Sequence, residues 1–229
     1  MAKGFREQQQ GFPRVRAAFE QHLASVEAAF AKANASWPPS GLFLRGHKLE
    51  DELELWADKR GGKGERVLVK RFVVCAKSGE LGPKAVSGDR QVPEGFYRVD
   101  RFNPRSSYHL SLGIDYPNAV DKARADGRPP GGDIFIHGNC ATIGCLPIED
   151  APMEWLYVAA VLARNEGEAI DVHVFPCRFG ADECEAALVS ADVEADTRSF
   201  WDSLRPAFLA FETTRVVPRV RATSKGYRM

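Results

Sequence analysis

The sequence predicts a mixed α+β protein, rich in β-strands, with helices attached at both ends. Between Leu42 and about Val99, short β-rich segments alternate with connections rich in Gly and Pro. Residues 13–35 and 194–211 instead carry apolar side chains at helical spacing. Successive strands followed by helices favour a mostly antiparallel sheet, and 229 residues suffice for one sizeable domain with additions or for two small ones.

The helices are predicted from their periodicity and their end signals. The first has Pro13 in its first turn and ends at "WPPSG", and its apolar face consists of Val15, Phe19, Leu23, Val26 and Phe30. A second helix should begin at Asp150, a suitable N-cap residue, and run to about Arg164. The last helix should bend at Pro206, and its apolar face consists of Phe200, Leu204, Phe208 and Phe211.

The predicted strands begin with "LFLRG", "LELWA", "RVLVKRFVVCA" and "FYRV". Further strands are expected in "SYHLSLGI", in "DIFIH" and in "AIDVHVF". The second strand has the two-residue period of a half-buried strand. Its two faces would consist of Leu53, Leu55 and Ala57 on the buried side and Glu52, Glu54 and Trp56 on the other.

Composition excludes several classes of function. Lys plus Arg equals Asp plus Glu at 31 each, so charge predicts no nucleic-acid partner, although the tail "RVVPRVRATSKGYRM" is basic. No apolar run is long enough for a membrane span, and the first residues lack the apolar core of a signal peptide. This predicts either a cytosolic protein or one whose export signal has been removed. Nucleotide-binding glycine motifs are missing from the sequence, so we expect no cofactor.

The segment "DIFIHGNCATIGCLPI" at 133–148 holds His137, Cys140 and Cys145. Gly144 lets a substrate carbonyl approach the backbone, and the N–H groups of Gly144 and Cys145 could converge on an oxyanion. His137 ends an apolar strand, where it can serve as the base that the thiol needs. The carbonyl of Gly138 would orient the imidazole as the third member of a triad.

Other interpretations of this segment stay open on the residues alone. His137, Cys140 and Cys145 form an H-x2-C-x4-C pattern, for which Cys177 or His109 could complete a zinc site. A Cys140–Cys145 disulfide would close a very tight loop. With five Cys in the chain, at least one thiol should be free.

"FIHGNCATIGC" resembles the catalytic motif of the L,D-transpeptidases with a YkuD domain, and most of all their YafK-like branch. Three further segments fit in the same order: "CAKSGELGPK" at 75–84, "GDRQVPEGFY" at 88–97 and "YHLSLGIDYPNAVD" at 108–121. The resemblance spans roughly Leu42 to Pro176. It divides the chain into an N-terminal helical extension (1–41), a catalytic domain (42–178) and a C-terminal helical extension with a basic tail (179–229).

The resemblance implies a β-rich, sandwich-like domain of the periplasm or cell envelope that acts on peptidoglycan stem peptides. Its cysteine would attack the carbonyl of the third stem residue, D-Ala would leave, and an amine would take the acyl group from the thioester. With water as the acceptor, the same site would be a hydrolase or amidase for crosslinks or protein–peptidoglycan links. By motif, Cys145 would be the nucleophile, His137 the base and Gly138 its orienting group. Gly144 would form part of the oxyanion hole, and Thr142 matches the motif's Ser/Thr position.

The sequence departs from the broad family at Ile143 and Pro147, where most members have His or Arg before the Gly-Cys pair and Arg after it. A missing Arg removes a bidentate partner for a substrate carboxylate. The acyl donor and acceptor are therefore left open. A catalytically silent cell-wall binding protein and a zinc-stabilised module are the other functional classes that fit the sequence.

The remaining His and Cys residues are expected to be structural. His109 would either line the cleft or support the fold, His173 would pack between strands, and His22 and His47 would lie at the surface. Cys75 would be a buried residue of an apolar strand. Cys177 and Cys184 could pair in an oxidising compartment.

Overall fold

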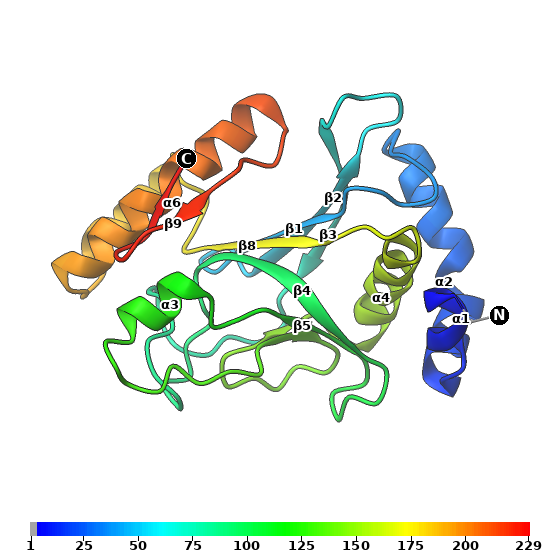
Figure 1. The fold of residues 1–229 in the computed structure, drawn as a ribbon, viewed down its shortest axis with the longest axis horizontal. Helices are drawn as coiled ribbons and strands as arrows, with labels where there is room; N and C mark the ends of the chain where they lie inside the picture. Colours follow the sequence, from blue (N-terminus) through cyan, green and yellow to red (C-terminus); the bar gives the residue numbers. More distant parts are fainter. Residues whose placement is uncertain (1–3) are drawn as a thin grey trace.

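The computed structural model describes residues 4–229 and is built on one eight-stranded sheet (Figure 1). The strand order is β3-β2-β1-β8-β4-β5-β6-β7. The strands are β1 (Phe43–His47), β2 (Glu52–Asp58), β3 (Arg66–Val73), β4 (Gly95–Asn103), β5 (Ser111–Ile114), β6 (Phe135–His137), β7 (Leu146–Pro147) and β8 (Asp171–Phe175). Only the β1–β8 and β6–β7 pairs within this sheet are parallel. The predicted β-rich, mixed α+β class is confirmed.

The sheet curls so that its two edge strands approach each other. Cys75, just after β3, donates its backbone N–H to the carbonyl of Pro147 in β7 at 2.9 Å. A disulfide between Cys75 and Cys140 adds a covalent link at the same place. This closure holds the segment between β6 and β7 against the end of β3.

Three helices cover one face of the sheet: α1 (Phe5–Gln10), α2 (Pro13–Lys32) and α4 (Asp150–Asn165). Figure 1 shows α4 lying between the sheet and the other two helices. Because α4 is enclosed on both sides, every residue from Trp155 to Ala163 is buried. The helix begins at Asp150, as predicted, but the N-cap position belongs to Glu149, whose φ is 64°.

The opposite face of the sheet is covered by α5 (Asp182–Ser190) and α6 (Ala195–Thr214), with α3 (Ala119–Arg124) beside them. The short ladder of β9 (Arg221–Ala222) and β10 (Tyr227–Arg228) packs on α6. This cover makes two sequence predictions wrong. Glu54 and Trp56, assigned to an open strand face, are buried, and so is His47, which was expected at the surface. All three side chains lie beneath α6. This helix is continuous through Pro206.

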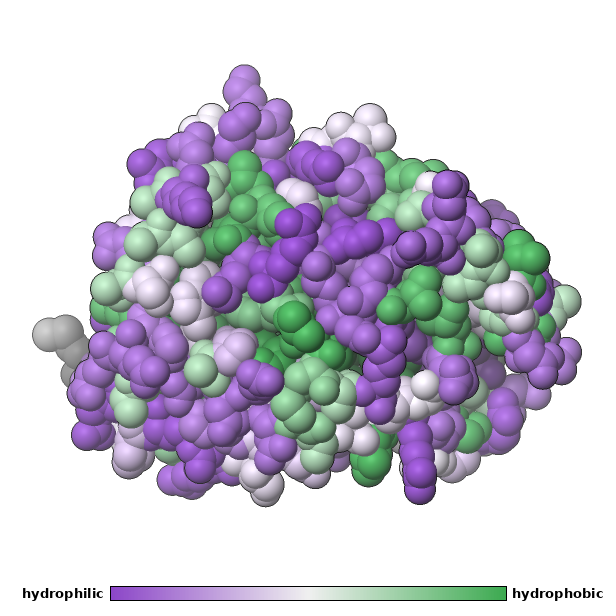
Figure 2. All heavy atoms as spheres, turned by 180° about the vertical axis from the view of Figure 1, so that it is seen from behind, coloured by the Kyte–Doolittle hydropathy of each residue, from purple (hydrophilic) through white to green (hydrophobic). Residues whose placement is uncertain are grey.

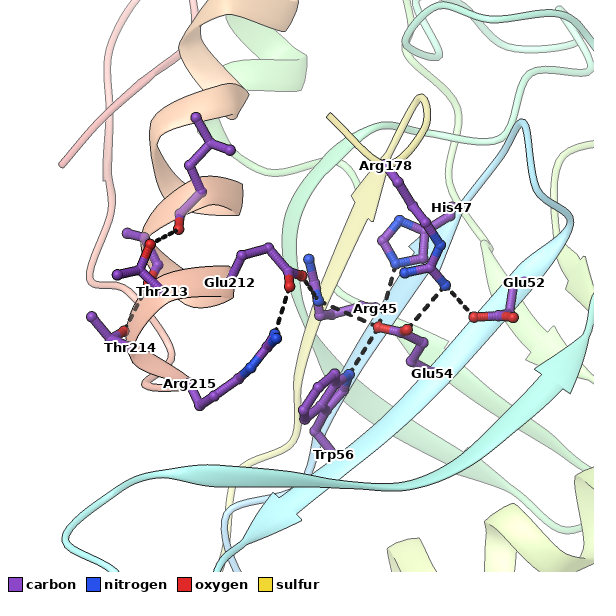
Figure 3. Close-up of polar contacts among 12 residues, drawn as sticks. Arg45, His47, Glu52, Glu54, Trp56, Arg178, Glu212, Thr213, Thr214 and Arg215 are labelled. Carbon is purple, nitrogen blue, oxygen red and sulfur yellow. Dashed lines mark hydrogen bonds and ion pairs between the residues drawn. The ribbon is translucent and has the colours of Figure 1, made fainter. Parts of the chain in front are cut away.

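A buried network of charged groups joins α6 to the sheet (Figure 3). Arg45 of β1 donates from Nη1 to Glu54 at 3.3 Å and to Glu212 of α6 at 2.7 Å. Trp56 donates its indole N–H to the same Glu54 carboxylate at 2.9 Å. The pairing keeps these charges from being buried without partners, which would be costly. His173, on the same face, was predicted to pack between strands, and its ring lies against Phe43 of β1 and Phe96 of β4.

The cysteines pair differently from the sequence predictions. Cys75 is not a buried strand residue, because it follows β3 and is bonded to Cys140. That bond also excludes the Cys140–Cys145 pairing in this covalent state. Cys177 and Cys184 form the pair that the sequence allowed, and Cys145 is the free thiol.

The surface offers no large continuous apolar area on the face shown in Figure 2, where apolar residues are interspersed with hydrophilic ones. Among residues 4–229, no helix has both the length and the apolar character that crossing a bilayer requires.

Candidate active site

The parallel pair β6–β7 brings the two predicted catalytic residues to one cavity. His137 is the last residue of β6, and Cys145 comes directly before β7. Both line a cavity of about 320 Å³ together with Thr142 and Ile143, the latter with 77% of its surface exposed. Tyr108, Asp133 and Phe135 complete the walls nearest to them.

The His137 imidazole is buried and held in one orientation. Its Nδ1 lies 2.5 Å from the carbonyl oxygen of Gly138, so Nδ1 carries the proton and donates it. Nε2 is therefore the unprotonated nitrogen of the neutral ring. The ring of Tyr108 lies 4.8 Å from the imidazole, measured between centroids. Burial lowers the pKa of His137, and its hydrogen bond with Gly138 only partly opposes that effect.

The Cys145 thiol is also in a setting that favours its neutral form. Burial raises its pKa, while a hydrogen bond from the backbone N–H of Phe135 to Sγ, at 3.4 Å, acts in the opposite direction. The nearby charge of Asp133 raises the pKa further. In the free protein, these effects together raise the pKa of Cys145 above that of an ordinary thiol.

Thr142 organises the turn before the nucleophile. Its Oγ1 accepts hydrogen bonds from the N–H groups of Gly144 (3.2 Å) and Cys145 (2.9 Å), and it donates to the Cys145 carbonyl at 2.9 Å. The two N–H groups do converge on one spot, as predicted, but the Thr142 hydroxyl occupies it. Gly144 has a φ of 131°, and a Cβ there would lie 3.0 Å from the Gln91 carbonyl oxygen, so the position requires glycine.

A second layer of polar residues supports the wall behind His137. A Cβ on Gly138 would lie 2.5 Å from Asp150 and 2.9 Å from the Cβ of His109. His109 is not among the residues that line the cavity, because its Nε2 faces Glu154 of α4 at 2.6 Å. His22 of α2 contacts the other oxygen of that carboxylate at 3.0 Å. The two histidines thereby tie α2 and α4 to the loop between β4 and β5, which packs against Gly138.

The zinc interpretation loses two of its donors in this covalent state. Cys140 and Cys177, which the sequence offered as ligands, both belong to disulfides. Cys75, Cys140 and Glu149 place donor atoms within 4.8 Å of one another, but both sulfurs there are bonded to each other. These residues do not fit a metal ion while the disulfides are intact.

Residues 52–169 match the family of the YkuD L,D-transpeptidase catalytic domain, and the chain belongs to this family. It is 30% identical over 191 residues to YafK of Escherichia coli (strain K12), which carries a provisional L,D-transpeptidase name. That match covers 82% of this chain and 73% of YafK. The family acts on peptidoglycan and is associated with the cell envelope.

The likeness to solved structures is weaker. The helical cell shape determining protein Pgp2 from Campylobacter jejuni aligns with a TM-score of 0.49 at 17% identity, over 88% of this chain and 82% of Pgp2. L,D-transpeptidase 1 of Mycobacterium tuberculosis aligns with a TM-score of 0.33 at 12% identity, over 59% of this chain and 62% of the other.

Proposed function

We propose that the protein is a cysteine acyltransferase of peptidoglycan that works through a thioester on Cys145. One observation carries the proposal: a free thiol and a neutral imidazole, whose tautomer is set by the Gly138 carbonyl, line the same cavity. A thiol nucleophile, a base and a group that orients the base are the parts that acyl transfer needs. The family supplies the substrate class, a stem peptide of peptidoglycan.

The proposed reaction begins from the neutral pair. Nε2 of His137 takes the Sγ proton while the sulfur attacks the carbonyl of the third stem residue. The C–N bond to the fourth residue then breaks, and the imidazolium returns the proton to the leaving amine. An acceptor amine attacks the thioester and gives its proton to Nε2 of His137. The C–S bond then breaks and the imidazolium returns that proton to the sulfur, so Cys145 is again a thiol.

The tetrahedral intermediates carry a negatively charged oxygen that needs donors. The N–H groups of Gly144 and Cys145 are the proposed donors, and they become free when the substrate oxygen displaces the Thr142 hydroxyl. Ile143 is the proposed apolar contact for the substrate, because its side chain lines the cavity and is exposed.

Hydrolysis is the second candidate function, with water in place of the amine. Ile143 and Pro147 replace the cations that most family members carry, so neither position can pair with a carboxylate on an acceptor stem. Loss of that contact favours an acceptor without a carboxylate, such as water. The protein would then cut crosslinks or protein–peptidoglycan links in the cell envelope.

The test is intact mass spectrometry of the protein after incubation with a carbapenem and, separately, with purified stem peptides. A covalent adduct on Cys145 that is missing from Cys145→Ala supports an acylable nucleophile. Stem-peptide products then separate transfer from hydrolysis. Stem-peptide binding that survives in Cys145→Ala, combined with a wild type that forms no adduct and no product, would instead indicate a binding module.

A further inference from the structure

An ion pair lies beside the cavity that holds Cys145. Asp133 is one of the residues on the cavity wall, and Arg101 of β4 donates from Nη1 to its carboxylate at 2.7 Å. The backbone carbonyl oxygen of Asp133 lies 3.8 Å from Sγ of Cys145, so the pair is close to the atom that would be acylated. Among the described residues on this wall, Asp133 alone carries a full charge when His137 is neutral.

The register of the sheet places Arg101 on the face that the cavity occupies. One row of paired residues across β4, β5 and β6 lines the cavity: Asn103, Ser111 and His137. The next row on the same face, two residues along each strand, consists of Arg101, Gly113 and Phe135. Because Gly113 has no side chain, the Arg101 guanidinium can cross it and lie over the Phe135 ring, 4.8 Å from its centroid. Arg101 therefore contacts two residues of the cavity wall, Phe135 and Asp133.

Each member of the pair keeps one polar group that a ligand could use. The Asp133 side chain is 81% exposed and binds Arg101 through Oδ1, while Oδ2 has no hydrogen-bond partner among residues 4–229. The Arg101 side chain is 43% exposed, and its Nε donates to Asp100 at 3.2 Å, which leaves Nη2 for a ligand. Two carboxylates and one guanidinium give this cluster a net negative charge, so it attracts a cation first.

The ligand that fits these two groups carries an ammonium and a carboxylate on the same carbon atom. Its ammonium would donate to Oδ2 of Asp133, and its carboxylate would accept from Nη2 of Arg101. A ligand with the ammonium alone leaves Nη2 unused, and one with the carboxylate alone meets the net negative charge of the cluster. The free end of a diamino dicarboxylic acid has both charges in this arrangement, whereas a lysine side chain has only the ammonium.

We propose that Arg101 and Asp133 form a specificity-determining subsite for the free amino acid end of the third residue of the donor stem. The sulfur would attack the carbonyl of that residue, so its side chain starts beside Cys145 and can extend to Asp133. Arg101 then supplies the cation that Ile143 and Pro147 do not provide. This assignment rests on the proposed function, because acylation of Cys145 decides which stem residue lies next to the pair.

Isothermal titration calorimetry of Cys145→Ala with three synthetic stem tetrapeptides tests the subsite. The third residue of these peptides is diaminopimelate, which has both end charges, lysine, which has only the ammonium, or aminopimelate, which has only the carboxylate. The diaminopimelate peptide should bind about fivefold more tightly than either of the others. Equal affinity for the three peptides, or no binding of any of them up to several millimolar, would overturn the proposal.

Variants made in the same Cys145→Ala protein assign each charge to its partner. Arg101→Gln should remove the advantage of the diaminopimelate peptide over the lysine peptide, because the carboxylate loses its donor. Asp133→Asn should remove the advantage over the aminopimelate peptide, because the ammonium loses its counter-charge. Arg98→Gln is the matched control and should keep both preferences, since it breaks an exposed ion pair of the same strand with Asp171 of β8. Preferences that survive both of the first two substitutions would refute the assignment.

The same peptides separate a failure of the subsite from a failure of the proposed chemistry. A wild-type protein that forms the thioester with equal kcat/KM from all three peptides would refute the subsite and leave the chemistry standing. The expected binding preference in Cys145→Ala, combined with a wild type that forms no thioester, would support the subsite and refute the chemistry.

Discussion

Cys145 and His137 are both held in their neutral forms by burial, which raises the pKa of the thiol and lowers that of the imidazole. The proton should therefore move only as the sulfur attacks. We expect the rate of alkylation of Cys145 by iodoacetamide to keep rising above pH 8.5, roughly the ordinary pKa of a free thiol. His137→Ala should lower the rate near neutral pH.

The label reports on one site, because the other four cysteines are in disulfides. Peptide mapping of the alkylated protein across a pH series measures the profile. A plateau reached by about pH 7 would mean that a thiolate–imidazolium pair exists before the substrate arrives.

Thr142 makes three hydrogen bonds to the turn that presents the nucleophile. Thr142→Val keeps the shape of the side chain but removes all three, so we expect Cys145 acylation to slow by about tenfold or more. Thr142→Ser, which retains the hydroxyl, should stay within a few-fold of the wild type. The rates are measured as single-turnover acylation by a carbapenem, monitored by intact mass spectrometry. Equal rates for the Val and Ser variants would show that the hydroxyl does not order the turn.

At the scale of elements, the Cys75–Cys140 disulfide connects the end of β3 to the loop between His137 and Cys145. Replacing both residues by Ala should cost about 2–4 kcal/mol of stability, because the bond closes a long loop. It should also slow acylation of the folded protein, since the loop loses its anchor. Cys177→Ala combined with Cys184→Ala is the control, because that pair lies in the core beneath α6, away from the nucleophile. Acylation as fast as wild type in the Cys75/Cys140 variant would contradict the anchoring role.

Elements with strong apolar periodicity were predictable from the sequence, and those without it were not. The helices α2 and α6 follow their repeating apolar residues, and their ends lie within a few residues of the predicted ones. The short helix α3 was not predicted, although Asn118 and Asp121 form a capping box that the sequence contains. α5 has only two buried residues, Cys184 and Leu188, which is too weak a pattern to identify it.

At the scale of the whole molecule, the sequence predicted the site residues that lie within one segment. It did not predict the supporting contacts that come from distant segments. The His137–Cys145 motif lies within one short segment, so the sequence could place it. Glu154 and His22, which support the motif through His109, come from two separate helices and leave no local signal. Burial of Glu54 depends on α6, whose Glu212 lies far along the chain, so a strand face with charged residues was predicted to be open.

The buried titratable groups should also set the acid stability of the molecule. Burial lowers the pKa of His47 to about 4 and that of His173 to about 3, so the unfolded chain binds more protons than the folded one between those values and about 6.5. Both lowered pKa values make the free energy of unfolding rise with pH in that window. Burial raises the pKa of Asp121 to about 7, so here the folded protein binds the extra proton, and this term makes stability fall as pH rises from about 4 to 7.

Two histidines outweigh one carboxyl group, so we expect the free energy of unfolding to increase from pH 4.5 to 6.5. Asp121→Asn removes the opposing contribution while keeping a side chain that can accept hydrogen bonds at the start of α3. The increase with pH should therefore become steeper in this variant, whatever its absolute stability. Urea denaturation at four or five pH values measures both slopes. An unchanged slope in the variant would mean that Asp121 has the same pKa in the folded and unfolded chains. A free energy of unfolding that falls with pH in the wild type would contradict the lowered pKa values of the buried histidines.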